Sequence, residues 1–522
     1  MGTLTARDPA TGARLGEVRG TAPEAVAELV AGAAKVQPLW ALLQVRDRAR
    51  YMARMAQATI DAYDELLERI AREQGRPRAE VAALELLPAI EALRWMAQDG
   101  AKVLGGRRVG SSPSLGPMRA RIAYEPYGVV AVIGAGSAPF AQPLGQIAGA
   151  LLAGNGVVFK PAARAWMAGE AIAGLLARAG LPEGLVAVAH GGSQTGIALG
   201  RAQGVGKLLF TGSPAVGRAL AREAVTREKE VTVELGGKDA MLVLADADLA
   251  KAVDCALWAG CAGAGQARGA VERIFVEEEI AQAFTELLVE RARTLRVGDP
   301  ADPRTQVGPL ASRRRLERVM ELTGEAVEQG AELRCGGPLA APGDCTGTFY
   351  APAVLSGAQP RMRAMREPLD APVLAVASID SVEQGVELVN DCDYGLGASV
   401  WTADRYRGAR IARDLRAGMV WINDHLPAPT LARGPWGAAA GGGLGKTLGE
   451  TGLRACAQEK LIAWSPQALR GPWWGPYDAT SARAARTAAK LRSARGREQA
   501  LRQGSTALAR MGARMLGRGV PR

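Results

Sequence analysis

The stretch GVVAVIGAGSAPFAQPLGQIAGALLAGNGVVFKP runs from Gly128 to Pro161 and carries no charged residue before Lys160. Two β-rich runs, GVVAVI and GVVF, enclose an apolar segment with the composition of a helix. The stretch is long enough to raise the question of a membrane span, but Pro139, Pro143 and several glycines divide it into strand, loop, helix, turn and strand. We therefore interpret it as a buried βαβ unit.

Short β-rich runs continue to alternate with helical segments after this unit. LVAVAH, KLLFT and a helix beginning near Ala215 follow it, and a second series starts at Ala240 with AMLVL, ERIFV, PVLAVASI, ASVWT and MVWIN. This alternation is typical of doubly wound α/β folds, which bind ligands at the carboxyl ends of their parallel strands. We predict two such domains, with Asp248 as the N-cap of a helix in the second.

The composition limits the kinds of protein to consider. The chain has 522 residues, of which 48% are hydrophobic and 22% charged, so it is folded and too long for one core. Its six cysteines are scattered and it has only two histidines, so we predict neither a metal site nor a disulfide framework. The N-terminus lacks the apolar core of a signal peptide, and a reducing cytoplasm is the expected location.

The net charge of +11 is concentrated at the C-terminus. After Ala479 the chain carries eleven Arg and Lys residues against the single Glu498. The spacing predicts a basic amphipathic helix, of the kind that binds anionic membranes or nucleic acid; a solvated extension without a partner is the alternative. The apolar positions expected on one face of this helix are Leu491, Ala494, Leu501, Leu508 and Met515.

Eight short motifs together resemble the NAD(P)-dependent aldehyde dehydrogenase superfamily over roughly residues 1–470. Each motif is weak alone, but their order and spacing are highly specific. The resemblance implies an aldehyde-dehydrogenase-like α/β fold: a doubly wound parallel-sheet cofactor domain, a second α/β catalytic-type domain and a small oligomerisation sheet. The motifs are DPATG at Asp8, EPYGVV at Glu125, GNGVVFKP ending at Pro161, FTGSPAVG from Phe210, ELGGK from Glu234, YGLGASVWT from Tyr394, GMVWIND from Gly418 and GPWG from Gly434.

The resemblance also implies a division of the chain and a kind of assembly. We expect a homo-oligomer, or a hetero-oligomer with an active relative. The predicted parts are a dinucleotide-binding-type domain (1–113 and 130–235), a catalytic-type domain (236–449), oligomerisation strands (114–129 and 450–470) and a basic C-terminal tail (471–522).

The family's reaction, as the resemblance implies it, needs a thiolate nucleophile, a hydrogen-bond donor for the oxyanion and a carboxylate base. Glu234 matches the base position, with an ion-paired structural glutamate as the alternative. The family pattern GQxCxAxER aligns with Gly265–Arg273 and puts Arg268 at the place of the nucleophilic cysteine. A guanidinium stays protonated and has no lone pair for attack. Ser137 stands where the oxyanion-binding asparagine is expected.

These losses predict a family member that is catalytically impaired or inactive, a pseudoenzyme with a binding, regulatory or scaffolding role. The alternative is slow NAD(P)-dependent oxidation of aldehydes without a thiol, with Glu234 as base. Arg268 would either close the site through a salt bridge to Glu234 or bind a carboxylate ligand. Cys261, seven residues earlier, is expected to be a core residue rather than a substitute nucleophile.

NAD and NADP are the candidate cofactors, and the resemblance assigns four residues to them. Lys160 matches the lysine that contacts the adenosine ribose. Gly212 and Ser213 open a helix whose N-terminus can receive a pyrophosphate. The acidic residue expected next to the ribose is replaced by Ala163, followed by Arg164, and this change favours NADP.

Other cofactor positions depart from the family pattern. Pro368 and Asp370 stand where the family has a glutamate and an aromatic residue near the nicotinamide ribose, which places cofactor binding at that end in doubt. The glycine run Gly441–Gly443 is expected to be flexible, and we assign no chemistry to its loop.

Overall fold

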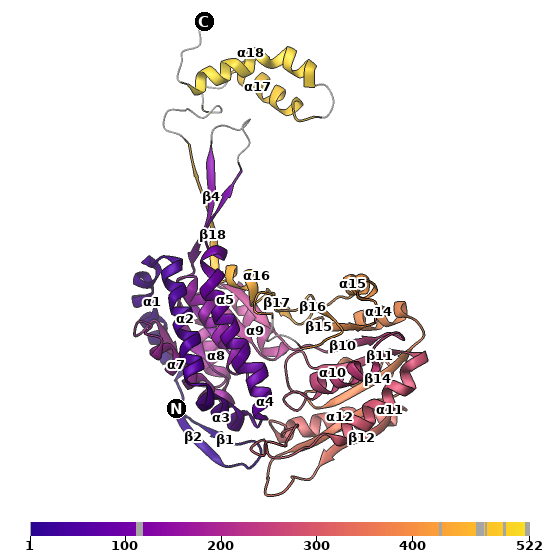
Figure 1. The fold of residues 1–522 in the computed structure, drawn as a ribbon. Coiled ribbons are helices and arrows are strands. Elements are labelled where there is room, and N and C mark those ends of the chain that lie inside the picture. Colours follow the sequence, from indigo (N-terminus) through magenta and orange to yellow (C-terminus); the bar gives the residue numbers. More distant parts are fainter. Residues whose placement is uncertain are drawn as a thin grey trace. The chain divides into compact units, whose positions relative to one another are not determined.

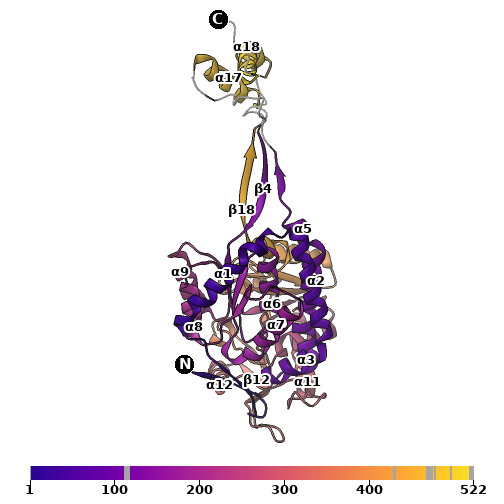
Figure 2. The same ribbon diagram turned by 90° about the vertical axis from the view of Figure 1, so that its left-hand side faces the viewer.

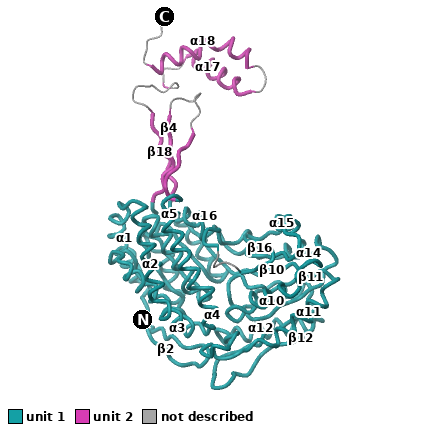
Figure 3. Tube along the Cα trace, viewed as in Figure 1, with its two compact units in different colours: residues 1–103, 126–457 teal, residues 104–125, 458–522 magenta. Residues whose placement is uncertain are grey.

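The structure is a computed structural model that describes residues 2–110, 118–426, 431–465, 474, 478–493 and 497–516. The chain forms two compact units, coloured separately in Figure 3. The first unit comprises Met1–Val103 and Pro126–Ala457, and the second comprises Leu104–Glu125 and Gln458–Arg522.

A six-stranded sheet in the first unit contains the βαβ stretch. Its strands are β5 (Val129–Ile133), β6 (Gly156–Lys160), β7 (Val186–Val188), β8 (Val205–Thr211), β9 (Glu230–Glu234) and β17 (Gly443–Leu444). The order is β17-β9-β8-β5-β6-β7, and only the edge strand β17 is antiparallel. Chain order reverses between β5 and β8, and open α/β sheets bind ligands at such a switch point.

Helices cover both faces of this sheet (Figures 1 and 2). One face buries Val129 and Phe210 against Val30, Leu199 and Leu220 of three helices, which confirms a doubly wound core. These helices are α1 (Val26–Leu42), α8 (Ser193–Arg201) and α9 (Pro214–Val225). The other face is covered by α6 (Ala141–Leu152) and α7 (Trp166–Arg178), with α2 (Val45–Asp61), α3 (Tyr63–Gln74) and α5 (Leu87–Val103) packed on them.

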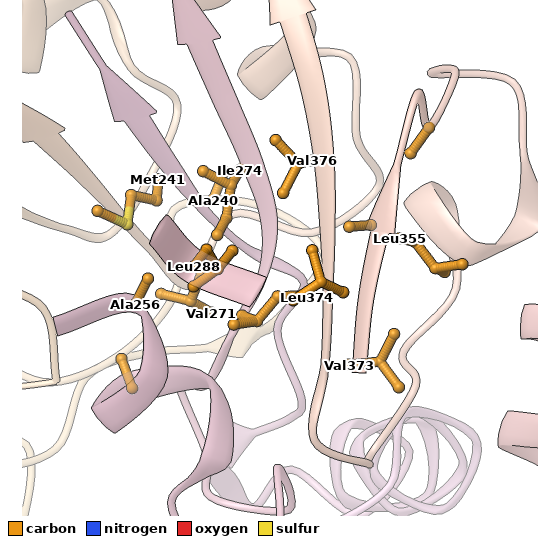
Figure 4. Packing of buried hydrophobic residues seen from close by; sticks show 14 of the residues in the cluster. Ala240, Met241, Ala256, Val271, Ile274, Leu288, Leu355, Val373, Leu374 and Val376 are labelled. Carbon is orange, nitrogen blue, oxygen red and sulfur yellow. The ribbon is translucent and has the colours of Figure 1, made fainter. Parts of the chain in front are cut away.

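A seven-stranded sheet forms the second α/β core of the same unit. Its order is β12-β13-β14-β11-β10-β15-β16, parallel except at the β12 edge. Figure 4 shows part of its apolar core, where Met241, Ile274 and Val376 lie near one another. The strands are β10 (Asp239–Val243), β11 (Val271–Glu277), β12 (Glu332–Leu339), β13 (Phe349–Ser356), β14 (Val373–Ile379), β15 (Gly397–Trp401) and β16 (Met419–Ile422).

One helix of this second core begins at the residue that the sequence predicts. The side chain of Asp248 accepts a hydrogen bond from the backbone N–H of Lys251, so the predicted N-cap is confirmed. The helices are α10 (Leu249–Cys261), α11 (Glu278–Thr294), α12 (Arg313–Glu328), α13 (Arg363–Arg366), α14 (Val382–Asn390) and α15 (Arg405–Asp414).

Short elements complete the first unit. They are the hairpin β1 (Thr3–Arg7) and β2 (Arg14–Arg19), the helices α4 (Arg78–Val81) and α16 (Gly449–Arg454), the 3₁₀ turns η1 (Pro23–Ala25) and η4 (Ala163–Ala165), and the π-helical turn η2 (Ala82–Leu86). In the described part of the chain no single helix is long and apolar enough to cross a membrane. The segments Pro23–Leu42 and Val45–Asp61 reach that length and composition only as a pair, bent by 116°.

The second unit consists of a pair of helices and most of a three-stranded sheet. The sheet has the order β18-β4-β3, with β3 (Arg107–Val109), β4 (Arg119–Pro126) and β18 (Ala457–Trp464). Lys460 pairs with Glu125 across β18 and β4 at 2.5 Å. The strands predicted within residues 114–129 and 450–470 therefore lie side by side in one sheet.

The basic tail forms two helices, α17 (Ala479–Lys490) and α18 (Arg497–Met515), where the sequence predicted one amphipathic face. That prediction is wrong, because Ala484, Ala507 and Met511 form the contact between the helices and Leu501 is 48% exposed. Leu508 packs against this contact, whereas Ala494 lies outside the described residues. Arg514 pairs with Asp478, the N-cap of α17. Apolar residues thus hold the two helices together.

Candidate functional site

Two cavities meet beside the switch point of the six-stranded sheet. The first, called the cleft, has a volume of about 960 Å³ and lies at the carboxyl ends of β5, β6 and β8. The second, called the inner pocket, has a volume of about 130 Å³ and is lined mainly by apolar side chains such as Leu84, Met96 and Trp436. Ser137, Ala267 and Arg268 line both cavities.

The loop between α10 and β11 carries Arg268 and is held by its glycines. Gly263, Gly265 and Gly269 all have positive φ values. A Cβ at Gly265 would lie 2.1 Å from the backbone of Ala371, so only glycine fits there. The tight turns place the side chain of Arg268 at the junction of the two cavities.

Gln266 fixes the same loop through four hydrogen bonds, one of them from its Nε2 to the carbonyl of Pro309 at 3.4 Å. Its amide Nε2 donates to the carbonyl of Gly263 at 2.7 Å. Its Oε1 accepts from the backbone N–H of Ala311 at 2.9 Å and from Arg315 Nη1 at 2.8 Å. Gln266 belongs to the motif that the sequence analysis aligned. No sequence pattern indicated that Arg315, in a separate helix, would contact it.

Arg268 turns toward Glu234 and forms a buried ion pair with it. Arg268 Nη1 donates to Glu234 Oε2, and Nε donates to the backbone carbonyl of Leu235 at 2.9 Å. The guanidinium also lies 5.7 Å from the ring centre of Trp436, and the Arg268 side chain is only 7% exposed. A charged group buried to this degree needs its partner, so the pair holds Arg268 in place.

Glu234 has donors on both carboxylate oxygens. Thr447 Oγ1 donates to Oε1, and Gln142 Nε2 donates to Oε2 at 2.8 Å beside the Arg268 bond. The Glu234 side chain is 1% exposed, and it is not among the described residues that line either cavity. A general base must reach the proton that it removes. In this arrangement Glu234 is enclosed by its hydrogen-bond donors.

A second buried ion pair holds the loop that contains Ser137 in place. Arg76 pairs with Glu85 at 3.3 Å and donates through Nη2 to the Ser137 carbonyl at 2.5 Å. Glu85 Oε2 accepts from the backbone N–H groups of Phe140 and Ala141. Burial raises the pKa of Glu85, and the charge of Arg76 opposes that shift. This pair thus fixes the backbone at Ser137, whose assignment to the oxyanion position stays a prediction.

The glycine-rich loop near the C-terminus, expected to be flexible, forms hydrogen bonds with residues of the site. Gly443 pairs with Glu234 in the sheet, and Leu444 pairs with Val233. Thr447, three residues further along, donates to the Glu234 carboxylate. Lys446 Nζ donates to the carbonyls of Gly437 and Ala438, the latter at 3.0 Å. A glycine run has no side-chain alternation that would indicate a strand. The pairing of Gly443 and Leu444 with β9 could therefore not be predicted from the sequence.

The cysteine thiols lie away from the position of Arg268 or are buried and neutral. Cys261 lies in the apolar core, where burial raises its pKa to about 12, and the prediction of a core residue is confirmed. Of the six free cysteines, all of them described, Cys456 alone lines a cavity, the inner pocket. Burial raises the pKa of Cys456 to about 11, so it is a neutral thiol at pH 7.

The residues predicted to bind a cofactor all line the cleft. Lys160 ends β6, and its Nζ donates to the carbonyl of Pro161 at 2.9 Å. Burial lowers the pKa of Lys160 to about 8. Gly212 and Ser213 precede α9, whose first residue is Pro214. A free helix N-terminus and a lysine along one wall fit the adenosine diphosphate part of a dinucleotide.

The opposite end of the cleft fits a nicotinamide less well. Pro368 and Asp370 line it, and Asp370 has a φ of 49° and lies 3.7 Å from Arg315. The guanidinium of Arg164 lies against Gly136, next to Ser137. Charged side chains, those of Asp370 and Arg315, thus lie in this part of the cleft.

The comparisons with known proteins agree with this architecture. A family model described as "Aldehyde dehydrogenase family" matches residues 2–462. The chain belongs to the aldehyde dehydrogenase family. It is 32% identical over 454 residues to the betaine aldehyde dehydrogenase of Cereibacter sphaeroides (strain ATCC 17029 / ATH 2.4.9), a match that covers 87% of this chain and 92% of that protein.

Solved structures of this aldehyde dehydrogenase family share the fold. The aldehyde dehydrogenase of Mycobacterium tuberculosis, complexed with NAD⁺, matches with a TM-score of 0.84 and 32% identity, covering 88% of this chain and 94% of that one. An NAD⁺ complex of an aldehyde dehydrogenase from Bacillus cereus matches with a TM-score of 0.84 and 29% identity, covering 89% and 93%. The predicted fold class and family are thus confirmed.

Proposed function

We propose that this aldehyde dehydrogenase family protein does not oxidise aldehydes through a covalent thiol intermediate, and that it acts as a binding, regulatory or scaffolding protein. The ion pair between Arg268 and Glu234 carries this proposal. It joins the position of the nucleophile to the position of the base, so that neither group is available for its step. Ser137 in place of an asparagine removes an oxyanion donor, a loss that typically costs about 3 kcal/mol in acyl chemistry.

We further propose that the cleft binds an adenine nucleotide, with NAD and NADP as the candidates. Lys160, Gly212 and Ser213 would hold the adenosine diphosphate part. The relatives from M. tuberculosis and B. cereus were solved with NAD⁺, which supports such a ligand. A bound nicotinamide would supply a hydride acceptor.

The alternative, slow oxidation without a thiol, requires Glu234 to act as a base. The contacts of Glu234 weigh against it, because Thr447, Gln142 and Arg268 all donate to its carboxylate. NAD(P)H formation at 340 nm with a panel of aldehydes distinguishes the two functions. We expect no aldehyde-dependent signal from the wild type. A steady rate that the Glu234→Gln variant abolishes would instead establish the thiol-free oxidation.

We also propose an oligomer, of this chain alone or with an active relative, and a tail that binds an anionic surface or polymer. The exposed basic side chains of α17 and α18 support the proposal that the tail binds an anionic surface or polymer.

We expect full-length protein to bind anionic vesicles or DNA in low salt, and a truncation ending at Asp478 to bind neither. Equal binding by the two proteins would show that the tail has no such role. Light scattering of both gives the size of the assembly.

The six free thiols fit a reducing cytoplasm, which we propose as the location. Cell fractionation followed by detection of the chain would test this, and recovery from an oxidising compartment would contradict it.

A further inference from the structure

The inner end of the cleft carries an arginine without a partner. Arg164 is exposed to the cleft and makes no hydrogen bond or ion pair with any described residue. A Cβ at Gly136 would lie 2.4 Å from Arg164 Nε and 3.0 Å from its Cζ, so the guanidinium fills the space that this glycine leaves. Gly136 directly precedes Ser137, which lines both cavities. Arg164 therefore lies where the two cavities meet.

The acidic side chains of the cleft are already paired. Glu223 binds Arg201, Glu272 binds Lys238 at 2.5 Å, and Asp370 lies 3.7 Å from Arg315. No carboxylate among the described residues that line the cleft is thus left for Arg164.

Two other arginines are close enough to Arg164 to repel its charge. Enclosure in the cleft lowers the pKa of Arg164 to about 10, and the charges of Arg315 and Arg76 add to this shift, whereas Asp370 and Glu73 oppose it. The group remains protonated at neutral pH. Cations held together in a cleft repel one another, and a bound anion relieves that repulsion.

We propose that Arg164 and Arg315 form a phosphate-binding subsite at the inner end of the cleft. Guanidinium groups bind phosphate oxygens through two parallel hydrogen bonds, and two of them can hold one phosphate group from different sides. Arg315 is 26% exposed and is already oriented by its bond to Gln266. The ligand that fits carries a phosphate group at this end. The subsite does not depend on whether aldehyde chemistry is lost.

The phosphate could belong to a nucleotide that extends along the cleft or to a free anion. Calorimetry on the full-length protein with ATP and with inorganic pyrophosphate, both without metal, separates these sources. Tighter binding of ATP indicates a nucleotide, and equal binding indicates the free anion. In both cases we expect the Arg164→Ala variant to bind roughly ten- to a hundredfold more weakly, the usual effect of losing charge-assisted hydrogen bonds.

Two further variants make the test specific. Arg201→Ala removes the same charge from another wall of the cleft, where Glu223 pairs with it, and should change the affinity by less than about threefold. Gly136→Ala keeps the charge but displaces the guanidinium, and should reproduce the loss seen for Arg164→Ala. Gly174→Ala, whose Cβ meets nothing within 4 Å, controls for folding. The subsite is disproved if Arg164→Ala binds as tightly as the wild type, or if the wild type binds neither anion.

Discussion

Replacing Arg268 with alanine is expected to lower the free energy of unfolding by about 3–5 kcal/mol, because it leaves the buried carboxylate of Glu234 without its counter-ion. Glu234 is 1% exposed and keeps only the donors from Thr447 and Gln142. Urea unfolding, followed by tryptophan fluorescence, measures the loss.

A double-mutant cycle shows whether the loss comes from the pair. In a Glu234→Gln background, Arg268→Ala should cost at least about 2 kcal/mol less than in the wild type, because the charge that Arg268 compensates is absent. Arg313→Ala is the matched control, since its pair with Glu317 is exposed and should cost under about 0.5 kcal/mol. Additive losses around the cycle would contradict a coupled ion pair.

The second large effect is a gain of activity. Arg268→Cys combined with Ser137→Asn restores the two residue types that covalent aldehyde oxidation needs, a nucleophile and an oxyanion donor. At saturating NAD or NADP we expect aldehyde-dependent NAD(P)H formation at least about a hundredfold above the wild type, since one oxyanion donor alone contributes that much. Absorbance at 340 nm measures the rate.

The matched control differs from this double variant only in that it has no thiol at position 268. Arg268→Ala with Ser137→Asn also frees Glu234, but it provides no nucleophile, and should stay at the wild-type rate. A gain of equal size in this control would mean that removal of the guanidinium, rather than the new thiol, limits the rate. No gain in the Cys variant, with its thiol labelled by iodoacetamide and the cofactor bound, would contradict the proposal that Arg268 and Ser137 account for an absence of aldehyde oxidation.

The sequence was sufficient for the fold because the apolar strands are continuous and glycines mark the turns. VVAVI is buried at every position, as a central parallel strand requires, and the motifs around it fixed the register of the Arg268 loop. Gly265 illustrates the reason, since the close approach of Ala371 leaves space for no other residue.

Contacts between distant segments could not be predicted in the same way. Thr447 reaches Glu234 across more than two hundred residues, and Arg315 reaches Gln266 from a separate helix. Arg164 was considered only for its effect on the choice between NAD and NADP, and its approach to Gly136, which has no Cβ, carried no signal in the sequence. Side-chain directions of this kind depend on the packed structure, and the tail shows the same limit, with its apolar residues divided between two helices.

The most direct test of whether Arg268 has ended covalent catalysis is intact-mass spectrometry of the wild-type protein, quenched with acid after incubation with an aldehyde and NAD or NADP. A thiolate mechanism leaves a thioester on a cysteine during turnover. We expect the mass of the unmodified chain, because Arg268 cannot form the bond and the thiols of Cys261 and Cys456 are buried and protonated. An acyl adduct that forms only with aldehyde and cofactor together, on any cysteine, would contradict this conclusion.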